Sequence, residues 1–337
     1  MKVSVAMTTY NGEDYIIPQL DSLRRQIKAI DELLIYDDGS KDNTCQIIQE
    51  YIDKYHLINW KIYTNKTNLG FVGNFFQAIE QTTGDLIFLC DQDDIWEETK
   101  ISDMMAQIEK NPDIVVLNTA VRLIDKDGKK IKESLENDTL NANILLKKIE
   151  RGALEKFDFM YLSMANVSPG CTMCFRAELK KYLNKVKTLA IELKFPHDWC
   201  INMLGAACYN GTYFWNERLT NYRIHDNNTI GLDLEKKEEE REIHGIKSTK
   251  ELRIQYAIEM AQMKEIAYKI NQLCKNDPKI NKLYFCAKKR VNLMEHLNIV
   301  NYLRLFQYWK EYKILVGNKG IISDGIYALH LDNIFRK

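Results

Sequence analysis

Three carboxylates stand close together directly after a run of apolar residues. Leu86–Cys90 is apolar throughout, and Asp91, Asp93 and Asp94 follow within four positions. An uninterrupted apolar run of this length is typical of a strand covered on both faces, as in a parallel sheet. Ligands of such sheets bind beyond the carboxyl ends of the strands, and Mg2+ or Mn2+ commonly bridges carboxylates and substrate phosphates. Asp91 and Asp93 therefore predict a metal–diphosphate site, although an isolated Asp-x-Asp is more often a solvated turn.

The residues around this run alternate between predicted strands and predicted helices. Strands are expected at 3–7, 33–36, 61–64, 86–90 and 114–118, and helices up to about residue 26 and at 43–55, 71–81 and 101–110. This alternation predicts an α/β fold with a doubly wound, mostly parallel sheet flanked by helices. The carboxyl ends of neighbouring parallel strands meet at one edge. The polar clusters at 8–12, 37–40 and 91–94 should therefore line one crevice.

The second half of the chain predicts fewer strands and a separate helical region. Residues 125–155 are polar and irregular, a helix is expected at 197–207, and short strands are expected at 213–219 and 222–225. The charged run 235–242 has no apolar residue and predicts a solvated helix or a hinge. It divides the chain into a first domain, 1–232, and a helical carboxy-terminal region, 243–337. That region should hold helices at 252–273, 279–298 and 301–315, from the spacing of its apolar residues.

Charge and hydropathy limit the partners of the chain. Its 47 basic and 47 acidic residues balance, so composition gives no reason to expect nucleic acid as a partner. Residues 279–337 carry 11 Lys and Arg against 4 Asp and Glu, which suits an anionic surface such as a membrane. No apolar run approaches the roughly 18 residues needed to span a bilayer, and the amino terminus lacks a signal peptide's apolar core. We expect a cytoplasmic chain, peripheral to the membrane if it binds one.

Two smaller features have competing interpretations. The aromatic and basic residues of 302–313 suit a helix at a membrane interface, but also a helix packed on its own domain. The eight cysteines fit reducing conditions, where cysteine is mostly a small buried apolar residue. Cys171 and Cys174 form the only close pair, and no second Cys or His pair stands at zinc-site spacing. A structural role is therefore favoured for them over a metal or redox role.

Several short motifs occur in a fixed order along the first 232 residues. They are Thr9-Tyr-Asn-Gly12, Asp37-Asp-Gly-Ser40, Asn68-Leu-Gly70, Gly84-Asp85, Asp91-Gln-Asp-Asp-Ile-Trp96, Pro169-Gly-Cys-Thr172, His197-Asp-Trp199 and Tyr222-Arg-Ile-His225. Together they resemble the motifs of family-2 glycosyltransferases with the GT-A fold. Three of them, the motifs at 91–96, 197–199 and 222–225, are most similar to those of bacterial rhamnosyltransferases that build cell-wall or capsular rhamnose polysaccharides. The stretch 168–172 departs from the Thr-Gly-Gly-Thr of many relatives.

The resemblance implies an inverting transfer and assigns roles to its acids. Asp198 matches the position of the base that deprotonates the acceptor hydroxyl, although it could instead cap the helix that starts there. Mg2+ or Mn2+ would stabilise the leaving diphosphate. Asp93 is expected to bind the metal directly, Asp91 to contact the metal or the ribose, and Asp94 to lie behind them. His225 is expected to be a further ligand or to touch the diphosphate; a satisfied core histidine is the alternative.

The resemblance also implies where the donor and acceptor lie. Thr8, Tyr10 and Asp38 are expected against the nucleotide base, since a carboxylate can accept the imide N–H of a pyrimidine. An ordinary Asx turn would explain the stretch 37–40 equally well. The remaining candidates are Asn68 and Gly70 in a loop near the base, Arg223 beside the diphosphate, and Trp96, His197 and Trp199 at the acceptor. Core packing is an equal alternative for both tryptophans.

The predicted function is metal-dependent transfer of a sugar to a hydroxyl of a lipid-linked or growing polysaccharide. L-rhamnose from dTDP-rhamnose is favoured as the donor sugar, with a UDP-hexose as the alternative. A sugar-phosphate nucleotidyltransferase would need a glycine-rich phosphate loop, and residues 8–12 hold one glycine. No Gly-x-x-x-x-Gly-Lys-[Ser/Thr] loop is present either. A non-catalytic nucleotide-sugar binding module is disfavoured because Asp91, Asp93 and Asp198 are all retained.

Overall fold

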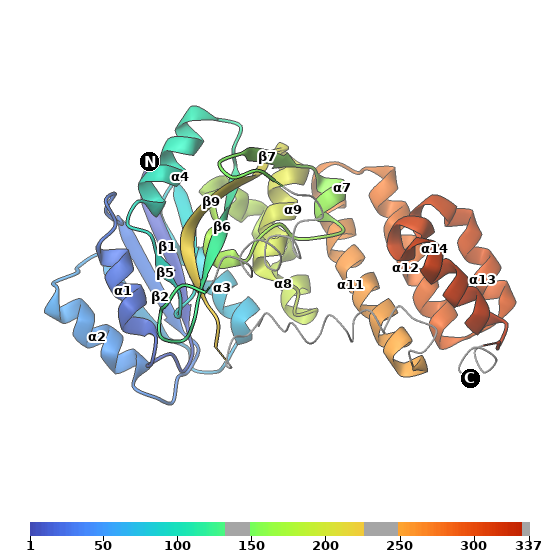
Figure 1. Cartoon of the computed structure of the whole chain (residues 1–337), viewed down its shortest axis with the longest axis horizontal. Helices are drawn as coiled ribbons and strands as arrows, with labels where there is room; N and C mark the ends of the chain where they lie inside the picture. The colour runs from blue at the N-terminus through green and yellow to red at the C-terminus, as the bar shows by residue number, and fades with distance from the viewer. Residues whose placement is uncertain (132–148, 226–248, 332–337) are drawn as a thin grey trace. The chain divides into compact units, whose positions relative to one another are not determined.

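The computed structural model describes residues 1–131, 149–225 and 249–331. Contacts within the chain divide it into two compact units, Met1–Gly231 and Leu232–Lys337 (Figure 1). The charged run 235–242, on which the predicted boundary depends, lies outside the described residues, as does most of the excursion at 125–155. The predicted domain division therefore stays a prediction.

The first unit is built on one mixed sheet of nine strands. Four parallel strands stand in the order β3 (Trp60–Thr64), β2 (Glu32–Asp37), β1 (Val3–Thr9) and β4 (Leu86–Cys90). The sheet continues from β4 through short and antiparallel strands and one further parallel pair. These strands are β8 (Cys174–Arg176), β6 (Val116–Ile124), β9 (Thr212–Arg223), β5 (Ile95–Trp96) and β7 (Leu154–Phe157). The predicted α/β class with a mainly parallel sheet is confirmed.

Helices cover both faces of this sheet, and its central strand β4 is accordingly apolar throughout. Leu86, Phe88 and Cys90 share one buried cluster with residues of three helices, α1 (Ile16–Arg24), α2 (Thr44–Lys54) and α4 (Lys100–Lys110). Successive strand residues point to opposite faces, so Ile87 and Leu89, also fully buried, face the other side. The remaining helices of this unit are α3 (Gly70–Gln81), α7 (Phe159–Leu162), α8 (Lys180–Glu192), α9 (His197–Tyr209) and the 3-10 turns η1 (Gly170–Thr172) and η2 (Ala177–Leu179).

Two strands are longer than the sequence predicted. The predicted pieces 213–219 and 222–225 are a single strand, β9, and β6 continues past Asn118 to Ile124. The polar residues that suggested strand ends are satisfied inside the fold. The Asn118 side chain donates to Asn202 Oδ1 at 2.7 Å, and the Asn221 side chain donates to the Ile95 carbonyl at 3.0 Å. A buried polar side chain with a partner does not interrupt a strand.

The second unit is helical in its described part, as predicted, but its last helices differ. Its elements are α11 (Lys250–Cys274), α12 (Pro278–Glu295), α13 (Ile299–Leu305), the 3-10 turn η3 (Phe306–Tyr308) and α14 (Trp309–Ala328). The single helix predicted at 301–315 is wrong: the chain turns at η3, and α14 extends to Ala328 across a kink at Gly317, whose φ is +66°. Among the described helices, none combines the length and apolar character that crossing a membrane requires.

A buried ionic network holds these last helices together. The Asp324 carboxylate accepts a hydrogen bond from Arg290 Nε at 2.8 Å and one from the Tyr312 hydroxyl at 2.7 Å. Its side chain is fully buried, so the carboxylate depends on these partners. This buried polar contact thus joins α12 to α14.

Candidate active site

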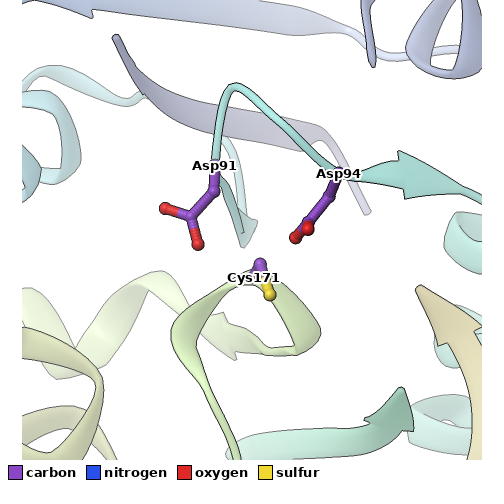
Figure 2. Close-up of side chains that lie close together, drawn as sticks. All are labelled: Asp91, Asp94 and Cys171. Carbon is purple, nitrogen blue, oxygen red and sulfur yellow. The ribbon is translucent and has the colours of Figure 1, made fainter. Parts of the chain in front are cut away.

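The acidic turn after β4 lies against the η1 turn. Asp91 directly follows β4 and Asp94 directly precedes β5, so the turn 91–94 between the strands brings both carboxyl groups to one place. Figure 2 shows them on either side of Cys171, and the potential ligand atoms of the three residues all lie within 4.8 Å of one another. The structure therefore brings together residues 80 positions apart in the chain, Asp91 and Cys171.

The electrostatics of this cluster favour a bound cation. Burial raises the pKa of Asp91 well above its usual range, and the charges of Asp94, Asp93 and Asp198 raise it further. Burial and the neighbouring charge of Asp93 raise the pKa of Asp94 to about 7. One oxygen of Asp94, Oδ2, is buried and makes no hydrogen bond to any described residue. Like charges crowded in a buried place are the situation that a divalent cation relieves.

The donor atoms favour a hard cation held by oxygen. Carboxylate oxygens suit Mg2+ and Mn2+, whereas a thiolate suits softer metals. Burial raises the pKa of the Cys171 thiol well above its usual range, so the sulfur stays protonated. Cys174 is likewise free and buried. The residues present thus fit an oxygen-ligated metal, and the two cysteines behave as buried apolar residues.

Asp93 points to a different partner, His225, at the end of β9. Its Oδ2 lies 2.9 Å from His225 Nε2, and the imidazole ring lies 4.5 Å from the ring of Tyr15. The two predicted ligands are therefore adjacent, although 132 positions separate them. A carboxylate and an imidazole that share a hydrogen bond have the distance and chemistry to share a metal ion instead.

Arg223 fastens the end of β9 to the acidic turn through the main chain. Its Nε donates to the Asp93 carbonyl at 2.7 Å and its Nη1 to the Lys126 carbonyl at 2.8 Å. Its backbone N–H donates to Asp94 Oδ1 at 3.1 Å. The guanidinium carbon lies 5.0 Å from the centre of the Tyr15 ring. Arg223 thus positions the loop that carries Asp93, as well as placing positive charge beside it.

The predicted nucleotide residues lie at the ends of adjacent strands. In the pairing of β1 with its neighbours, Thr8 stands opposite Tyr36 and Met7 opposite Cys90, so Asp91 comes next to Thr8. Tyr10 follows β1 and is 48% exposed, which leaves its ring free to stack on a base. The predicted residues thus stand at adjacent ends of neighbouring parallel strands; the crevice between them stays a prediction.

Asp38, Asn68 and Gly70 form one hydrogen-bonded group. Asp38 Oδ1 accepts from the Leu69 backbone N–H at 2.8 Å and from the Asn65 side chain at 2.9 Å. Asn68 donates to the Asp38 carbonyl at 3.1 Å and accepts from the Gly70 N–H at 3.0 Å. Gly70 has a φ of +70°, in the left-handed region that favours glycine. The loop 65–70 is thus held over the end of β2.

Asp198 lies in the first turn of α9 and does not cap that helix. The helix begins after Pro196, at which no side chain accepts a capping hydrogen bond. Asp198 is 6% exposed and its Oδ2 accepts a hydrogen bond from the Asn166 side chain at 2.9 Å. Burial raises the pKa of Asp198 to about 6. Because its charge contributes to the raised pKa of Asp91, the two carboxylates belong to one electrostatic environment.

The three aromatic residues predicted at the acceptor are mostly internal. Trp96 is 2% exposed and packs on Phe88, with ring centres 5.9 Å apart, so the core alternative describes it. Trp199 is half-buried and its indole N–H donates to the Leu162 carbonyl at 2.6 Å. His197 is buried and stacks on Phe75 at 4.0 Å, next to Asp198. Of the three, only His197 and Trp199 are neighbours of Asp198, which they flank in the chain.

Four site residues gave no signal in the sequence. The Gln92 amide pairs with both backbone groups of Tyr10, at 2.8 and 3.0 Å, and Asn65 supports Asp38. Asn166 orients Asp198, and Lys100 is buried beneath the acidic turn. Amides and lysines are common on surfaces, so their types alone predict no site. Of the four, only Gln92 could have been recognised as a site residue, because it stands between two aspartates.

The relation to known proteins follows once this geometry is in view. The sequence profile described as glycosyl transferase family 2 matches residues 4–183, more than half of the chain. The chain belongs to glycosyl transferase family 2. The predicted family is confirmed, and with it the prediction of a glycosyltransferase enzyme. The matched range ends before Asp198 and His225, so their roles rest on the geometry described above.

Curated relatives agree at the level of the family. An uncharacterised protein of Mycobacterium tuberculosis is 32% identical over 133 residues, which cover 39% of this chain and 38% of that protein. The match thus spans well under half the length of that relative. The dTDP-rhamnosyl transferase RfbG of Shigella flexneri is 27% identical over 236 residues, which cover 68% of this chain and 74% of that protein.

Solved structures of other proteins share the fold at low identity. Residues 1–349 of Staphylococcus aureus TarS, in complex with UDP, superpose with a TM-score of 0.54 at 19% identity, covering 92% of each chain. The mannosyltransferase PcManGT of Pyrobaculum calidifontis, in complex with GDP-Man and Mn2+, gives a TM-score of 0.52 at 12% identity. That alignment covers 97% of this chain and 87% of that one. At these identities the likeness concerns the fold alone.

Proposed function

We propose that this family-2 protein is an inverting glycosyltransferase that moves a sugar from a nucleotide-sugar donor to an acceptor hydroxyl. The observation that carries the proposal is the place of Asp198. Its carboxylate is buried, is oriented by Asn166, and acts electrostatically on Asp91 in the acidic turn. A base on one side and an acidic metal site on the other are what a single in-line displacement requires.

The transfer proceeds in one step with a balanced exchange of bonds. Asp198 takes the proton of the acceptor hydroxyl while that oxygen forms a bond to the anomeric carbon of the donor sugar. The bond from this carbon to the diphosphate breaks on the opposite face, so the configuration at the carbon inverts. A pKa of about 6 leaves Asp198 ionised near neutral pH and basic enough to accept a proton.

The residues present fit a divalent metal at the diphosphate. Asp93 and His225 would hold it, with Asp91 contacting the metal or the ribose and Asp94 held in place by the Arg223 backbone N–H. A bound Mg2+ or Mn2+ supplies a Lewis acid that neutralises the charge of the leaving diphosphate. Arg223 keeps the loop of Asp93 in position, and Thr8, Tyr10, Asp38, Asn68 and Gly70 face the nucleotide.

The favoured donor is dTDP-L-rhamnose, and the favoured acceptor is a lipid-linked or growing polysaccharide. The support is the match to the Shigella flexneri dTDP-rhamnosyl transferase over 68% of this chain, together with the motifs quoted above. A UDP-hexose is the alternative, because TarS was solved with UDP on the same fold. Donor choice depends on the shape of the sugar pocket, which the motifs leave undefined.

A direct assay separates these donors. The protein is incubated with dTDP-rhamnose, UDP-glucose or UDP-N-acetylglucosamine, with Mg2+ or Mn2+, and with a lipid-linked glycan acceptor. We expect release of dTDP and a glycan heavier by one deoxyhexose. Release of UDP with a heavier glycan would overturn the rhamnose proposal and keep the transferase. Binding of each donor without release of nucleotide in any combination would instead support a binding module.

The carboxy-terminal unit offers a surface that suits an anionic membrane. On α13, η3 and the first six residues of α14, six large apolar side chains are exposed, with Leu303 the most exposed at 58%; the others are Ile299, Val300, Phe306, Trp309 and Ile314. We name this set the α13–α14 patch. Arg304, Lys310 and Lys313 are exposed among them, and Phe306 stacks on Trp309 at 5.4 Å. Apolar and aromatic side chains ringed by basic groups are typical of proteins that lie on a lipid surface.

We expect the full chain to sediment with vesicles of phosphatidylcholine and phosphatidylglycerol but not with phosphatidylcholine alone. Replacing Leu303 and Trp309 together by serine should weaken this binding about 10-fold or more, because each buried CH2 contributes about 0.8 kcal/mol. The matched control is Ile58→Ser, which removes an apolar side chain that is 92% exposed in the sheet domain. A change of oligomeric state in the double variant, with unchanged lipid binding, would assign the patch to self-association instead.

A further inference from the structure

Lys100 is a buried lysine at the start of α4, and its ammonium group joins three separate segments. Its Nζ donates to the Cys171 carbonyl at 2.5 Å and to Thr220 Oγ1 at 2.8 Å. It also lies 3.7 Å from the centre of the Trp96 ring. The side chain is fully buried. A lysine removed from water is costly unless its charge is paired, so its presence here calls for a reason.

Through the Cys171 carbonyl, Lys100 contacts a turn that touches both halves of the proposed active site. On one side, Cys171 Sγ lies within 4.8 Å of the carboxyl oxygens of Asp91 and Asp94. On the other, a Cβ placed on Gly170 would lie 3.3 Å from Asp198 Cβ and 3.1 Å from His197 Nε2. Residues 169–172 therefore form the spacer between the acidic turn and the proposed base.

The turn has further ties inside itself and to β6 and β9: Thr119 Oγ1 donates to the Thr172 carbonyl at 3.2 Å, and Thr220 Oγ1 donates to the Cys171 carbonyl at 3.5 Å. Within it, Thr172 N–H donates to the Pro169 carbonyl at 3.1 Å and Met173 N–H to the Gly170 carbonyl at 3.0 Å. Ser168 Oγ links it to the Thr119 carbonyl at 2.8 Å. From α4, Lys100 supplies a charged hydrogen-bond donor to this turn. Its second acceptor, Thr220, stands in β9 three residues before Arg223.

We propose that Lys100 is a positioning residue that fixes the 169–172 turn, and with it the separation between Asp198 and the acidic turn. This role rests on the proposed transfer and adds a residue to it. Lys100 donates its hydrogen bonds to the Cys171 carbonyl and to Thr220 Oγ1. It acts by holding the Cys171 carbonyl and Thr220 so that the turn, α4 and β9 keep one arrangement. A misplacement of about 1 Å between reacting groups costs roughly 100-fold in rate.

Lys100→Met tests the role because methionine fills a similar volume without the charge or the donor. We expect kcat to fall about 10- to 100-fold while the KM of the donor changes less than about threefold. Lys180→Met is the matched control. Lys180 also donates to two carbonyls, those of Glu80 and Thr82 at 2.9 and 2.7 Å, but ties α8 to the end of α3. The Lys180→Met variant should have a lower melting temperature than the wild type and an unchanged kcat.

A second measurement needs no transfer activity. Hydrogen–deuterium exchange of the Thr172 and Met173 amides should be faster in Lys100→Met than in the wild type or in Lys180→Met, because the turn loses its anchor. Thr220→Val keeps the lysine but removes one of its acceptors, together with the 3.5 Å hydrogen bond from Thr220 Oγ1 to the Cys171 carbonyl. It should change the exchange and kcat in the same direction by less. It replaces Lys100→Met as the test if that variant does not fold.

The outcomes separate this inference from the proposed function. Faster exchange in the turn together with reduced kcat supports the positioning role. Exchange at the wild-type rate in folded Lys100→Met overturns it, and so does an equal loss of kcat in Lys180→Met. If the wild type transfers no sugar from any donor, the proposed function fails, while the exchange measurement still decides whether Lys100 anchors the turn.

Discussion

Asp198→Asn is expected to bind the nucleotide-sugar donor as the wild type does and to transfer sugar about 10²- to 10⁴-fold more slowly, the usual contribution of a general base. Asparagine keeps the size of the side chain and an oxygen that can still accept the hydrogen bond from Asn166, at 2.9 Å in the wild type. The fold should therefore survive, while the group that takes the acceptor proton is lost. Donor binding by calorimetry and initial rates of transfer give the comparison.

The matched control for this substitution is Asp113→Asn, since Asp113 is an exposed acid outside the site. It should transfer at the wild-type rate. Wild-type turnover in Asp198→Asn would remove Asp198 from the role of base and leave the donor site untouched. A loss of both donor binding and turnover would mean instead that Asp198 shapes the donor pocket.

The pH dependence of transfer should report the same carboxylate. Burial raises the pKa of Asp198 to about 6, and the base works only when ionised. The rate should therefore be constant above this pKa and fall about tenfold per unit of pH below it. The profile is measured as kcat/KM for the acceptor with donor and metal saturating. This acid limb should be missing from the residual activity of Asp198→Asn.

Asp93→Ala is expected to weaken metal-dependent binding of the nucleotide by about 100-fold or more, because the loss of a metal ligand costs several kcal/mol. The physical reason is the pair that Asp93 forms with His225, 2.9 Å apart at the meeting point of the acidic turn and β9. Titration of dTDP or UDP with and without Mn2+ measures the effect, since only the metal-dependent part should disappear.

Two comparisons make the Asp93 result specific. Asp113→Ala should bind nucleotide as the wild type does, and His225→Ala should share the loss of metal dependence if both side chains hold the ion. A metal-dependent nucleotide affinity in Asp93→Ala equal to that of the wild type would contradict the ligand role. In that case the Asp91 and Asp94 cluster, whose ligand atoms lie within 4.8 Å of one another and of Cys171, becomes the metal site.

The sequence by itself determined the sheet and the edge of it at which the candidate site residues lie. The apolar run of β4 must be covered on both faces, and its end must open at the edge of a parallel sheet, so Asp91 and the ends of β1 and β2 could be brought together from pattern alone. The regular apolar spacing likewise predicted α11 over most of its length. These predictions succeed because strand and helix periodicity is a local property of the chain.

Only the tertiary structure decided which distant side chains share the site and how. The separation of Asp93 from His225 is 132 positions, and that of Lys100 from Thr220 is 120. No local pattern encodes such contacts, because they depend on how β9 crosses the sheet. Burial is decided in the same way: Trp96 lies in the core and Lys100 beneath the acidic turn, since the packing of neighbouring elements sets exposure. The uninterrupted course of β9 was hidden for the same reason, because the distant Ile95 carbonyl accepts a hydrogen bond from the Asn221 side chain. The kink in α14 lies at Gly317, whose positive φ the apolar spacing of the sequence does not mark.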